Sequence, residues 1–215
     1  MKILIAFESS GRIREAMRAN GHDVWSCDVL PSEDNSPRHI IADVRTLDLT
    51  AYDLVGMHPP CTYLTGSGIH WNGRGRGWER TEEAIALVRW LMSHDLPWYL
   101  ENPVGIISSR IRKPNQIIQP FEFGDDASKK TCLWLNRLDH LPKHPAKRFP
   151  GRWVACNGKL VERWSNQTDS GQNRLGPSPT RWKERSRTYV GIAQAMADHW
   201  APKKEAMRSG VLSIA

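Results

Sequence analysis

Short apolar segments that alternate with helical patterns constrain the fold of this chain more than any other feature. The apolar segments predicted to be strands are 3–7, 24–27, 39–42, 54–57 and 97–100. Apolar residues have helical spacing between Ile13 and Asn20 and again from Thr81 to Met92. Because strands that alternate with helices form parallel sheets, the sequence predicts an α/β fold with a mostly parallel sheet.

The size and composition fit one globular domain with a small appendage. The chain has 215 residues, of which 40% are hydrophobic and 25% charged, and these values exclude a disordered or collagen-like chain. Residues 1–8 are predicted to be a strand rather than a signal peptide, and no apolar run reaches the roughly 18 residues of a membrane helix. Four scattered cysteines without a C-x-x-C pair argue against a disulfide framework and a zinc site. We therefore expect a cytoplasmic protein with no membrane partner and no metal.

Polar side chains stand at the ends of four predicted strands: Asp28, Asp43, Cys61 and Glu101. The carboxyl ends of parallel strands meet at one edge of a sheet, where α/β proteins bind ligands. Asp28 follows the second strand, and an acidic residue at this position commonly binds the ribose hydroxyls of a nucleoside cofactor. Alternatively, Asp28 could simply cap a turn. Cys61 follows two prolines that fix its position, whereas a lone cysteine is more often a small buried residue. Glu101 could likewise be a solvated strand end.

The positive charge of the chain is concentrated in its second half. Residues 137–189 hold 12 basic and 4 acidic residues, a net charge of +8, whereas the whole chain has a net charge of +7. Three tryptophans and several Asn and Gln residues lie among them, a composition typical of surfaces that contact nucleic acid. A solvated loop region of a basic protein would have a similar composition, so both interpretations stay open.

Several segments resemble, in the same order along the chain, the motifs of one enzyme family. Phe7 to Gly11 is similar to an F-x-G-x-G cofactor loop, with Ser9 in place of a glycine. Residues 53–61, DLVGMHPPC, are similar to a D-L-x-x-G-x-P-P-C signature, and residues 101–103, ENP, resemble an E-N-V motif. Pro-Pro-Cys alone would be weak evidence for a family. Its occurrence together with Glu-Asn further along the chain is a specific signal. In these segments the chain resembles the DNA cytosine-5 methyltransferases, including the compact versions carried by bacteriophages and prophages.

The resemblance implies a Rossmann-like S-adenosylmethionine-dependent methyltransferase fold with a mostly parallel sheet and a small basic recognition lobe. The implied reaction transfers a methyl group from S-adenosylmethionine to C5 of cytosine in double-stranded DNA. Cys61 would form a covalent adduct with C6 of the base, and Glu101 would hydrogen-bond N3 and the exocyclic amine. The base would be flipped out of the duplex. The glycine-rich segment 66–77, for which no regular structure is expected, would close over it.

The resemblance also implies which residues bind cofactor and DNA. The cofactor would contact Phe7, Ser9, Gly11, Asp28, Asp43, Pro60, Gly191, Ile192 and Ala193, the last three at the position of a G-N-A motif. The DNA contacts would come from Trp71, Arg74, Arg76, Asn102, Lys129, Thr131, Arg163, Trp164 and Arg174. Lys129 and Thr131 stand where the family has the arginines of Q-x-R-x-R, and Ile192 stands where it has an asparagine. We expect contacts there to differ from those of the family. Trp164 could instead belong to the core of the lobe.

The implied organisation is a catalytic and cofactor-binding part over residues 1–137, a basic target-recognition region over 138–184, and a C-terminal helix over 185–215 that returns to the catalytic part. Such a chain is expected to act as a monomer in the cytoplasm of a bacterial host. Three alternatives are a decayed methyltransferase-like protein that binds DNA or a nucleotide, a methyltransferase of cytosine nucleotides, and an amino-methyltransferase. Cys61 after Pro-Pro argues against the last.

Overall fold

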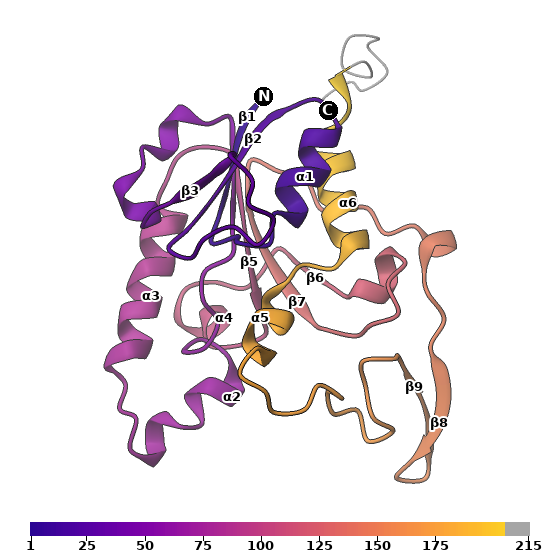
Figure 1. The fold of residues 1–215 in the computed structure, drawn as a ribbon. Helices are drawn as coiled ribbons and strands as arrows, with labels where there is room; N and C mark the ends of the chain where they lie inside the picture. The colour runs from indigo at the N-terminus through magenta and orange to yellow at the C-terminus, as the bar shows by residue number, and fades with distance from the viewer. Residues whose placement is uncertain (205–215) are drawn as a thin grey trace.

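A sheet of seven strands forms the centre of the fold, and helices cover both of its faces (Figure 1). The computed structural model describes residues 1–204. The strands of this sheet are β1 (Lys2–Ala6), β2 (Asp23–Asp28), β3 (His39–Ile41), β4 (Leu54–Met57), β5 (Trp98–Pro103), β6 (Gln116–Ile118) and β7 (Thr131–Asn136). Their order across the sheet is β3-β2-β1-β4-β5-β7-β6.

The strand directions confirm the predicted fold class. The neighbouring pairs from β3 to β5 are parallel, whereas β7 runs antiparallel to both β5 and β6. The five predicted strands correspond to β1 to β5, each within a few residues. The strand order reverses between β1 and β4, which makes the sheet Rossmann-like and places a topological switch point beside the end of β1.

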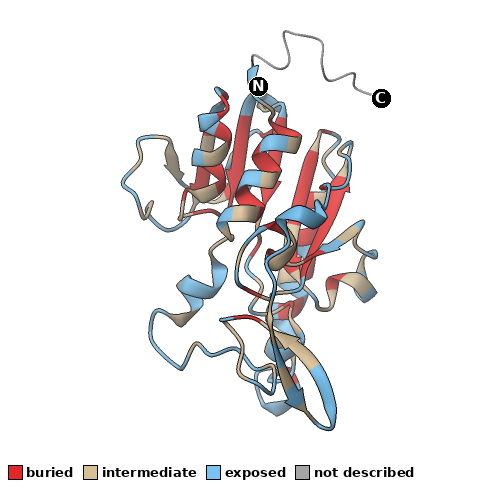
Figure 2. Cartoon of the chain, turned by 90° about the vertical axis from the view of Figure 1, so that its right-hand side faces the viewer, coloured by how far each residue is buried: buried red, intermediate tan, exposed pale blue. Residues whose placement is uncertain are grey.

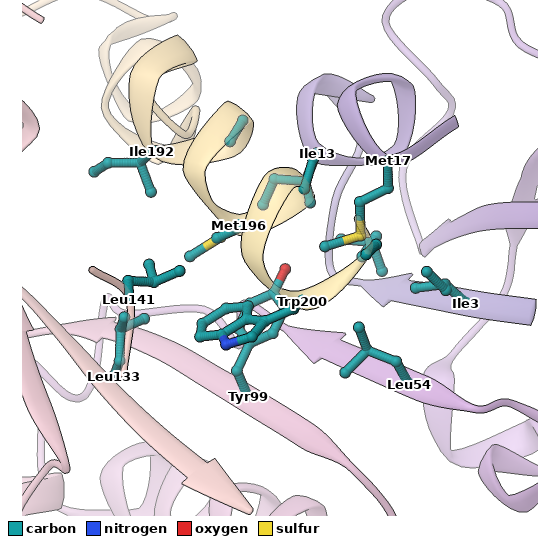
Figure 3. Close-up of a cluster of buried hydrophobic side chains, with 14 of the residues drawn as sticks. Ile3, Ile13, Met17, Leu54, Tyr99, Leu133, Leu141, Ile192, Met196 and Trp200 are labelled. Carbon is teal, nitrogen blue, oxygen red and sulfur yellow. The ribbon is translucent and has the colours of Figure 1, made fainter. Parts of the chain in front are cut away.

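Helices from both ends of the chain cover one face of the sheet. Helices α1 (Arg12–Ala19) and α6 (Val190–Trp200) pack against each other there, and α3 (Glu79–Met92) covers the opposite face (Figure 1). Figure 3 shows the core between α1, α6 and the sheet, where the rings of Tyr99 and Trp200 stack with centroids 4.8 Å apart. Helix α6 therefore completes the core of the N-terminal part of the chain.

The turn between β1 and α1 is shaped by a buried carboxylate and a glycine. The carboxylate of Glu8 accepts hydrogen bonds from the backbone N–H groups of Ile13 (2.7 Å) and Arg14 (3.2 Å), which lie in the first turn of α1. Gly11 has a φ of 69°, and a Cβ atom there would collide with the Arg14 guanidinium. The turn thus depends on the carboxylate of Glu8 and on the absence of a side chain at Gly11.

Strand β5 is longer than the sequence predicts. Its parallel pairing with β4 ends where Met57 lies opposite Leu100, but its antiparallel pairing with β7 continues to Pro103 opposite Thr131. Glu101 therefore lies inside the strand rather than after it. This extension gives Glu101 a fixed backbone and a side-chain direction set by the sheet.

The expectation of no regular structure in the glycine-rich segment 66–77 is wrong. It contains α2 (Gly66–Ile69) and the 3-10 helix η3 (Asn72–Arg74). The Thr65 hydroxyl accepts a hydrogen bond from Gly68 N at 3.3 Å, and the buried Asn72 amide donates to the Thr81 hydroxyl at 2.7 Å. These side-chain contacts supply the local order that glycine itself lacks.

The other helical elements are single turns or slightly longer. They are α4 (Ile107–Arg110), α5 (Arg181–Ser186), η1 (Val44–Thr46), η2 (Leu49–Ala51), η4 (Pro120–Phe123) and η5 (Pro145–Lys147). Within residues 1–204, none of the helices is both long and apolar enough to cross a membrane.

A hairpin of β8 (Arg152–Cys156) and β9 (Lys159–Arg163) projects from the body, and Figure 2 shows that it is far less buried than the central sheet. Its base is fixed by Trp164, which is 7% exposed and stacks on Phe121 with ring centroids 3.9 Å apart. The Trp164 indole N–H donates to the Phe149 carbonyl at 3.1 Å. Trp164 is thus a core residue of this region, whereas Trp153 in β8 is 65% exposed.

Replacement of the two tryptophans should affect stability to very different extents. Trp164→Ala should lower the free energy of unfolding by about 3 to 5 kcal/mol, because it removes a buried ring and its hydrogen bond. The matched variant Trp153→Ala should change it by less than about 0.5 kcal/mol. Urea unfolding followed by circular dichroism would measure both, and equal losses would contradict the assignment of Trp164 to the core.

Candidate functional site

The ends of β4 and β5 bring two predicted catalytic side chains to one edge of the sheet. The parallel pair places Met57 opposite Leu100, so the loop of His58, Pro59, Pro60 and Cys61 leaves β4 beside the continuing part of β5. Glu101 is the next residue of β5. The loop therefore carries the thiol past this carboxylate.

Two hydrogen bonds hold the first half of that loop. His58 N donates to the Ala6 carbonyl at 3.1 Å, and the Asn102 amide donates to the Pro59 carbonyl at 2.8 Å. Asn102 is 1% exposed, and its other amide atom, Oδ1, has no hydrogen-bond partner in the structure. Asn102 thus shapes the proline loop, and we do not assign it to the DNA surface. The two prolines add rigidity, because each fixes its own φ.

Glu101 lies among three hydrogen-bonding or charged neighbours. His58 Nδ1 is 3.4 Å from Glu101 Oε2. Thr131 on β7 lies opposite Pro103, two residues further along β5, and contributes to the surroundings of the carboxylate. Burial by itself raises the pKa of Glu101, but the hydrogen bond from His58, the charge of Lys129 and the bond from Thr131 outweigh it. The pKa therefore lies below its ordinary value, and Glu101 is ionised at neutral pH.

The pKa of Cys61 is shifted in the opposite direction, above its ordinary value. Burial raises the pKa of its thiol, the charge of Glu101 raises it further, and the charges of Lys129 and Arg185 only partly oppose this. Cys61 is partly accessible, whereas Cys27 and Cys132 are buried, and burial raises the pKa of each to about 11. The resting site thus holds a protonated thiol close to an ionised carboxylate.

A cationic pair beside the thiol comes from distant parts of the chain. Lys129 precedes β7, and its ammonium donates to the Arg185 carbonyl at 3.0 Å, which ties this strand to α5. Both charges act on Cys61. The sequence motifs point to Lys129 and Thr131, but not to Arg185 or His58. Arg185 belongs to a run of basic residues in which nothing distinguishes it.

The turn after β1 and the end of β2 could hold a nucleoside. Phe7 has a φ of 61°, so the chain turns sharply as it leaves β1 towards Ser9 and Gly11. Asp28 is half-buried at the end of β2, where burial raises its pKa, and its carboxylate accepts from Leu30 N at 3.0 Å. Val29, the next residue, is 67% exposed. A carboxylate beside an exposed apolar side chain fits a ribose with its attached base.

The carboxylate of Asp43 is less available to a ligand than its position at the edge of the sheet suggests. Hydrogen bonds from the Arg45 side chain and backbone lower the pKa of Asp43 to about 2. The guanidinium engages both carboxylate oxygens, at 3.0 Å and 3.1 Å from Nε. A ligand amino group would have to share this carboxylate with Arg45.

The segment 191–193 lies at the start of α6. Gly191 N donates to Asp125 Oδ2 at 3.0 Å, and a Cβ atom on Gly191 would collide with the Phe123 carbonyl. Ile192 and Ala193 are buried in the hydrophobic core under α6. This packing accounts for their apolar character without a cofactor, so we leave them out of the proposed pocket.

The glycine-rich segment presents aromatic and basic side chains to solvent. Trp71 is 51% exposed, and the Arg74 guanidinium lies 6.0 Å from its ring centroid. Arg76 donates to the Gly68 carbonyl at 3.1 Å and lies over the Tyr63 ring. Arg74 is therefore held less firmly than Arg76.

The arginines of the basic region are partly used to hold the region itself. Arg163 Nε donates to the Asp169 carbonyl at 3.1 Å, and Arg152 contacts the Asp169 carboxylate at 2.6 Å. Arg174 is exposed, although its Nε donates to the Gln167 carbonyl at 2.7 Å. Arg163 thus has a structural role, and Arg174 is more accessible to a partner.

Across residues 1–204, no cluster of three or more His, Cys, Asp or Glu side chains has the arrangement of a metal site.

Comparisons with known proteins give structural similarity but no sequence family. No protein-family model matches the sequence, and a search of curated proteins finds no match. One similar solved structure is the Entamoeba histolytica methyltransferase EhMeth, with 12% identity and a TM-score of 0.47 over 67% of this chain and 55% of that chain. Another is a candidate DNA modification methyltransferase encoded within an Escherichia coli prophage, with 15% identity and a TM-score of 0.40 over 65% and 49%. The match spans about half the length of each of these proteins.

The charges around Cys61 predict how its reactivity changes. Glu101→Gln removes a charge that raises the thiol pKa, so the thiolate fraction below that pKa should increase and alkylation by iodoacetamide should become faster. Lys129→Met removes an opposing charge and should make alkylation slower. Peptide mapping by mass spectrometry would give the rate at each cysteine, with Cys156 of the hairpin as the internal control. Unchanged or slower alkylation of Cys61 in Glu101→Gln would show that Glu101 does not raise the pKa of this thiol.

Proposed function

We propose that this protein transfers a methyl group from S-adenosylmethionine to C5 of cytosine in DNA, through a covalent adduct with Cys61. The observation that supports this most is the placement of Cys61 and Glu101 at the ends of the adjacent strands β4 and β5, where the charge of Glu101 raises the pKa of the thiol. Covalent attack on a cytosine ring needs a thiol at C6 and an acid at N3. The resemblance to the cytosine-5 methyltransferases assigns those roles to the same two residues.

The edge of β1 and β2 is the proposed cofactor site. Phe7, Ser9 and Gly11 would approach the cofactor through the backbone, and Asp28 would accept hydrogen bonds from its ribose, with Pro60 on the catalytic side. The half-buried carboxylate of Asp28 and the exposed Val29 support this assignment. Asp43 would contribute only by sharing its carboxylate with Arg45. When bound, S-adenosylmethionine supplies an electrophilic methyl group on sulfur.

In the first step, the attack of Cys61 on C6, groups of the site itself can donate and accept the proton that moves. As the Cys61 sulfur bonds to C6, the thiol must lose a proton and N3 of the base must gain one. The resting site has the proton on Cys61 and a negative charge on Glu101, so one proton passed from the thiol to the carboxylate, and then to N3, balances the step. C5 then carries the electron density for methylation. Loss of the C5 proton to water and cleavage of the sulfur–carbon bond restore the aromatic ring, and return of the N3 proton through Glu101 to the sulfur restores the resting thiol.

The basic region and the glycine-rich segment are the proposed DNA contacts. C5 and C6 are inaccessible inside a stacked duplex, so the base must leave the stack. Trp71 and Arg74 offer an exposed ring and a cation, while Lys129 and Thr131 contribute to the surroundings of Glu101. The net charge of +8 over residues 137–189 fits the DNA backbone.

The main alternative is a methyltransferase-like protein that binds DNA or a nucleotide without catalysis. Such a protein would not need a thiol and a carboxylate in electrostatic contact, and the coupling of Cys61 with Glu101 favours the enzyme. A methyltransferase of cytosine nucleotides would use the same two groups. Its activity would not depend on the basic region.

Trapping on DNA tests the reaction. DNA that contains 5-fluorocytosine should form a covalent complex with the wild-type protein when S-adenosylmethionine is present, because the fluorine cannot leave as a proton does. Cys61→Ala should abolish both this complex and transfer of labelled methyl groups, while Cys156→Ala should leave both unchanged. Glu101→Gln should slow transfer by about 100-fold or more. Methyl transfer by Cys61→Ala would exclude the covalent mechanism.

Salt dependence tests the proposed DNA contacts. The logarithm of the binding constant for duplex DNA should fall linearly with the logarithm of the salt concentration. Arg174→Ala and Lys159→Ala should each flatten this slope by about one if the residue contacts a phosphate. Arg18→Ala, at the opposite end of the sheet, is the control. Binding by fluorescence anisotropy that is insensitive to salt and to both variants would favour a nucleotide substrate.

A further inference from the structure

His58 connects the proposed catalytic carboxylate to the buried core. Its Nδ1 atom is 3.4 Å from Glu101 Oε2, and its Nε2 atom is 3.2 Å from the hydroxyl of Tyr99. The side chain of His58 is 11% exposed and that of Glu101 is 15% exposed. Both nitrogen atoms of the ring thus have a partner in a region with little access to water.

Tyr99 holds the imidazole from the side opposite to Glu101. It is fully buried in β5, with its ring stacked on Trp200 and edge-on to the His58 ring at 5.5 Å. Burial raises the pKa of Tyr99 well above its ordinary value, so the hydroxyl keeps its proton. A buried O–H needs an acceptor, and His58 Nε2 is at hydrogen-bonding distance.

This pairing selects one tautomer of His58. With Nε2 accepting from Tyr99, the ring proton lies on Nδ1 and is donated towards Glu101. The titratable groups around the imidazole are Glu101 and Tyr99 from β5, together with Glu8 after β1. Glu8 is itself held by two N–H groups of α1, and burial raises its pKa.

The backbone of His58 is fixed as firmly as its ring. Its N–H donates to the Ala6 carbonyl at 3.1 Å, and the following proline disfavours the helical conformation at this residue. The imidazole therefore starts from a fixed backbone position just after β4 and has a defined partner on β5. A group held at both ends can fix the rotamer of its neighbour.

We infer that His58 is a positioning residue that holds Glu101 in the orientation required beside Cys61, with Tyr99 fixing the tautomer of the imidazole. This inference rests on the proposed function. Glu101 must present one oxygen to N3 of the base while its other oxygen stays anchored. The Nδ1 proton of His58 anchors Oε2, so the carboxylate can receive and release the proton of the first step without rotating.

Three variants test the inference on the full-length protein. His58→Leu removes both ring nitrogens, His58→Asn retains an N–H donor near the place of Nδ1, and Tyr99→Phe removes only the hydroxyl. We expect His58→Leu to lower kcat for methyl transfer by about tenfold or more while KM for DNA changes little, because an anchor of the catalytic group is lost. His58→Asn should recover most of the rate, and Tyr99→Phe should have an intermediate effect. Thermal unfolding would identify any variant that fails to fold.

A second measurement does not depend on methyl transfer. Titration of Glu101 by carbon NMR, with its resonance identified by its absence in Glu101→Gln, should show a higher pKa in His58→Leu than in the wild type. In His58→Asn the pKa should stay close to that of the wild type. An unchanged titration in His58→Leu, or equal shifts in both variants, would overturn the inference. Absence of transfer by the wild type with the expected NMR shifts would instead refute the proposed function and leave the His58 contact established.

Discussion

The candidate site depends on the register between β4 and β5. Because Met57 lies opposite Leu100, the loop that starts at His58 leaves the sheet beside Glu101. A shift of one residue would turn the Glu101 side chain to the opposite face, among the apolar residues under α3. The register is fixed by burial of both strands, since the core contains side chains from each on both faces of the sheet. The chemistry of Cys61 and Glu101 is therefore a consequence of core packing.

The antiparallel strand β7 extends β5 and brings a cation to the site, neither of which the parallel pair β4 and β5 supplies. It extends β5 by pairing Glu101 with Leu133 and Pro103 with Thr131, and it brings Lys129 to the same edge. Helix α5 is tied to this edge through the bond from Lys129 to the Arg185 carbonyl. The thiol is thus surrounded by charges from segments before β7 and after the hairpin, although it lies in the first third of the chain.

Local patterns in the sequence predict the parallel half of the sheet, because each buried strand there is a short apolar run. The end of β5 is less predictable. Residues 101–103 have no apolar pattern that would predict a strand, and pairing with β7 keeps them extended. The order of the glycine-rich segment depends on contacts such as that between Asn72 and Thr81, which the composition does not show. Cys61 and Glu101 are identifiable from motifs, but His58 becomes informative only when Tyr99 and Glu101 are seen on either side of it.

The basic region shows why net charge overstates the surface available to a partner. Glu162 pairs with Arg148 and Asp169 with Arg152, so part of the positive charge stabilises the fold of this region. In α5 and the residues after it, Lys183 and Arg187 both contact Glu33, whereas the charge of Arg185 acts on Cys61. The internal ion pairs fix the position of α5, and α5 in turn places a cation beside the thiol.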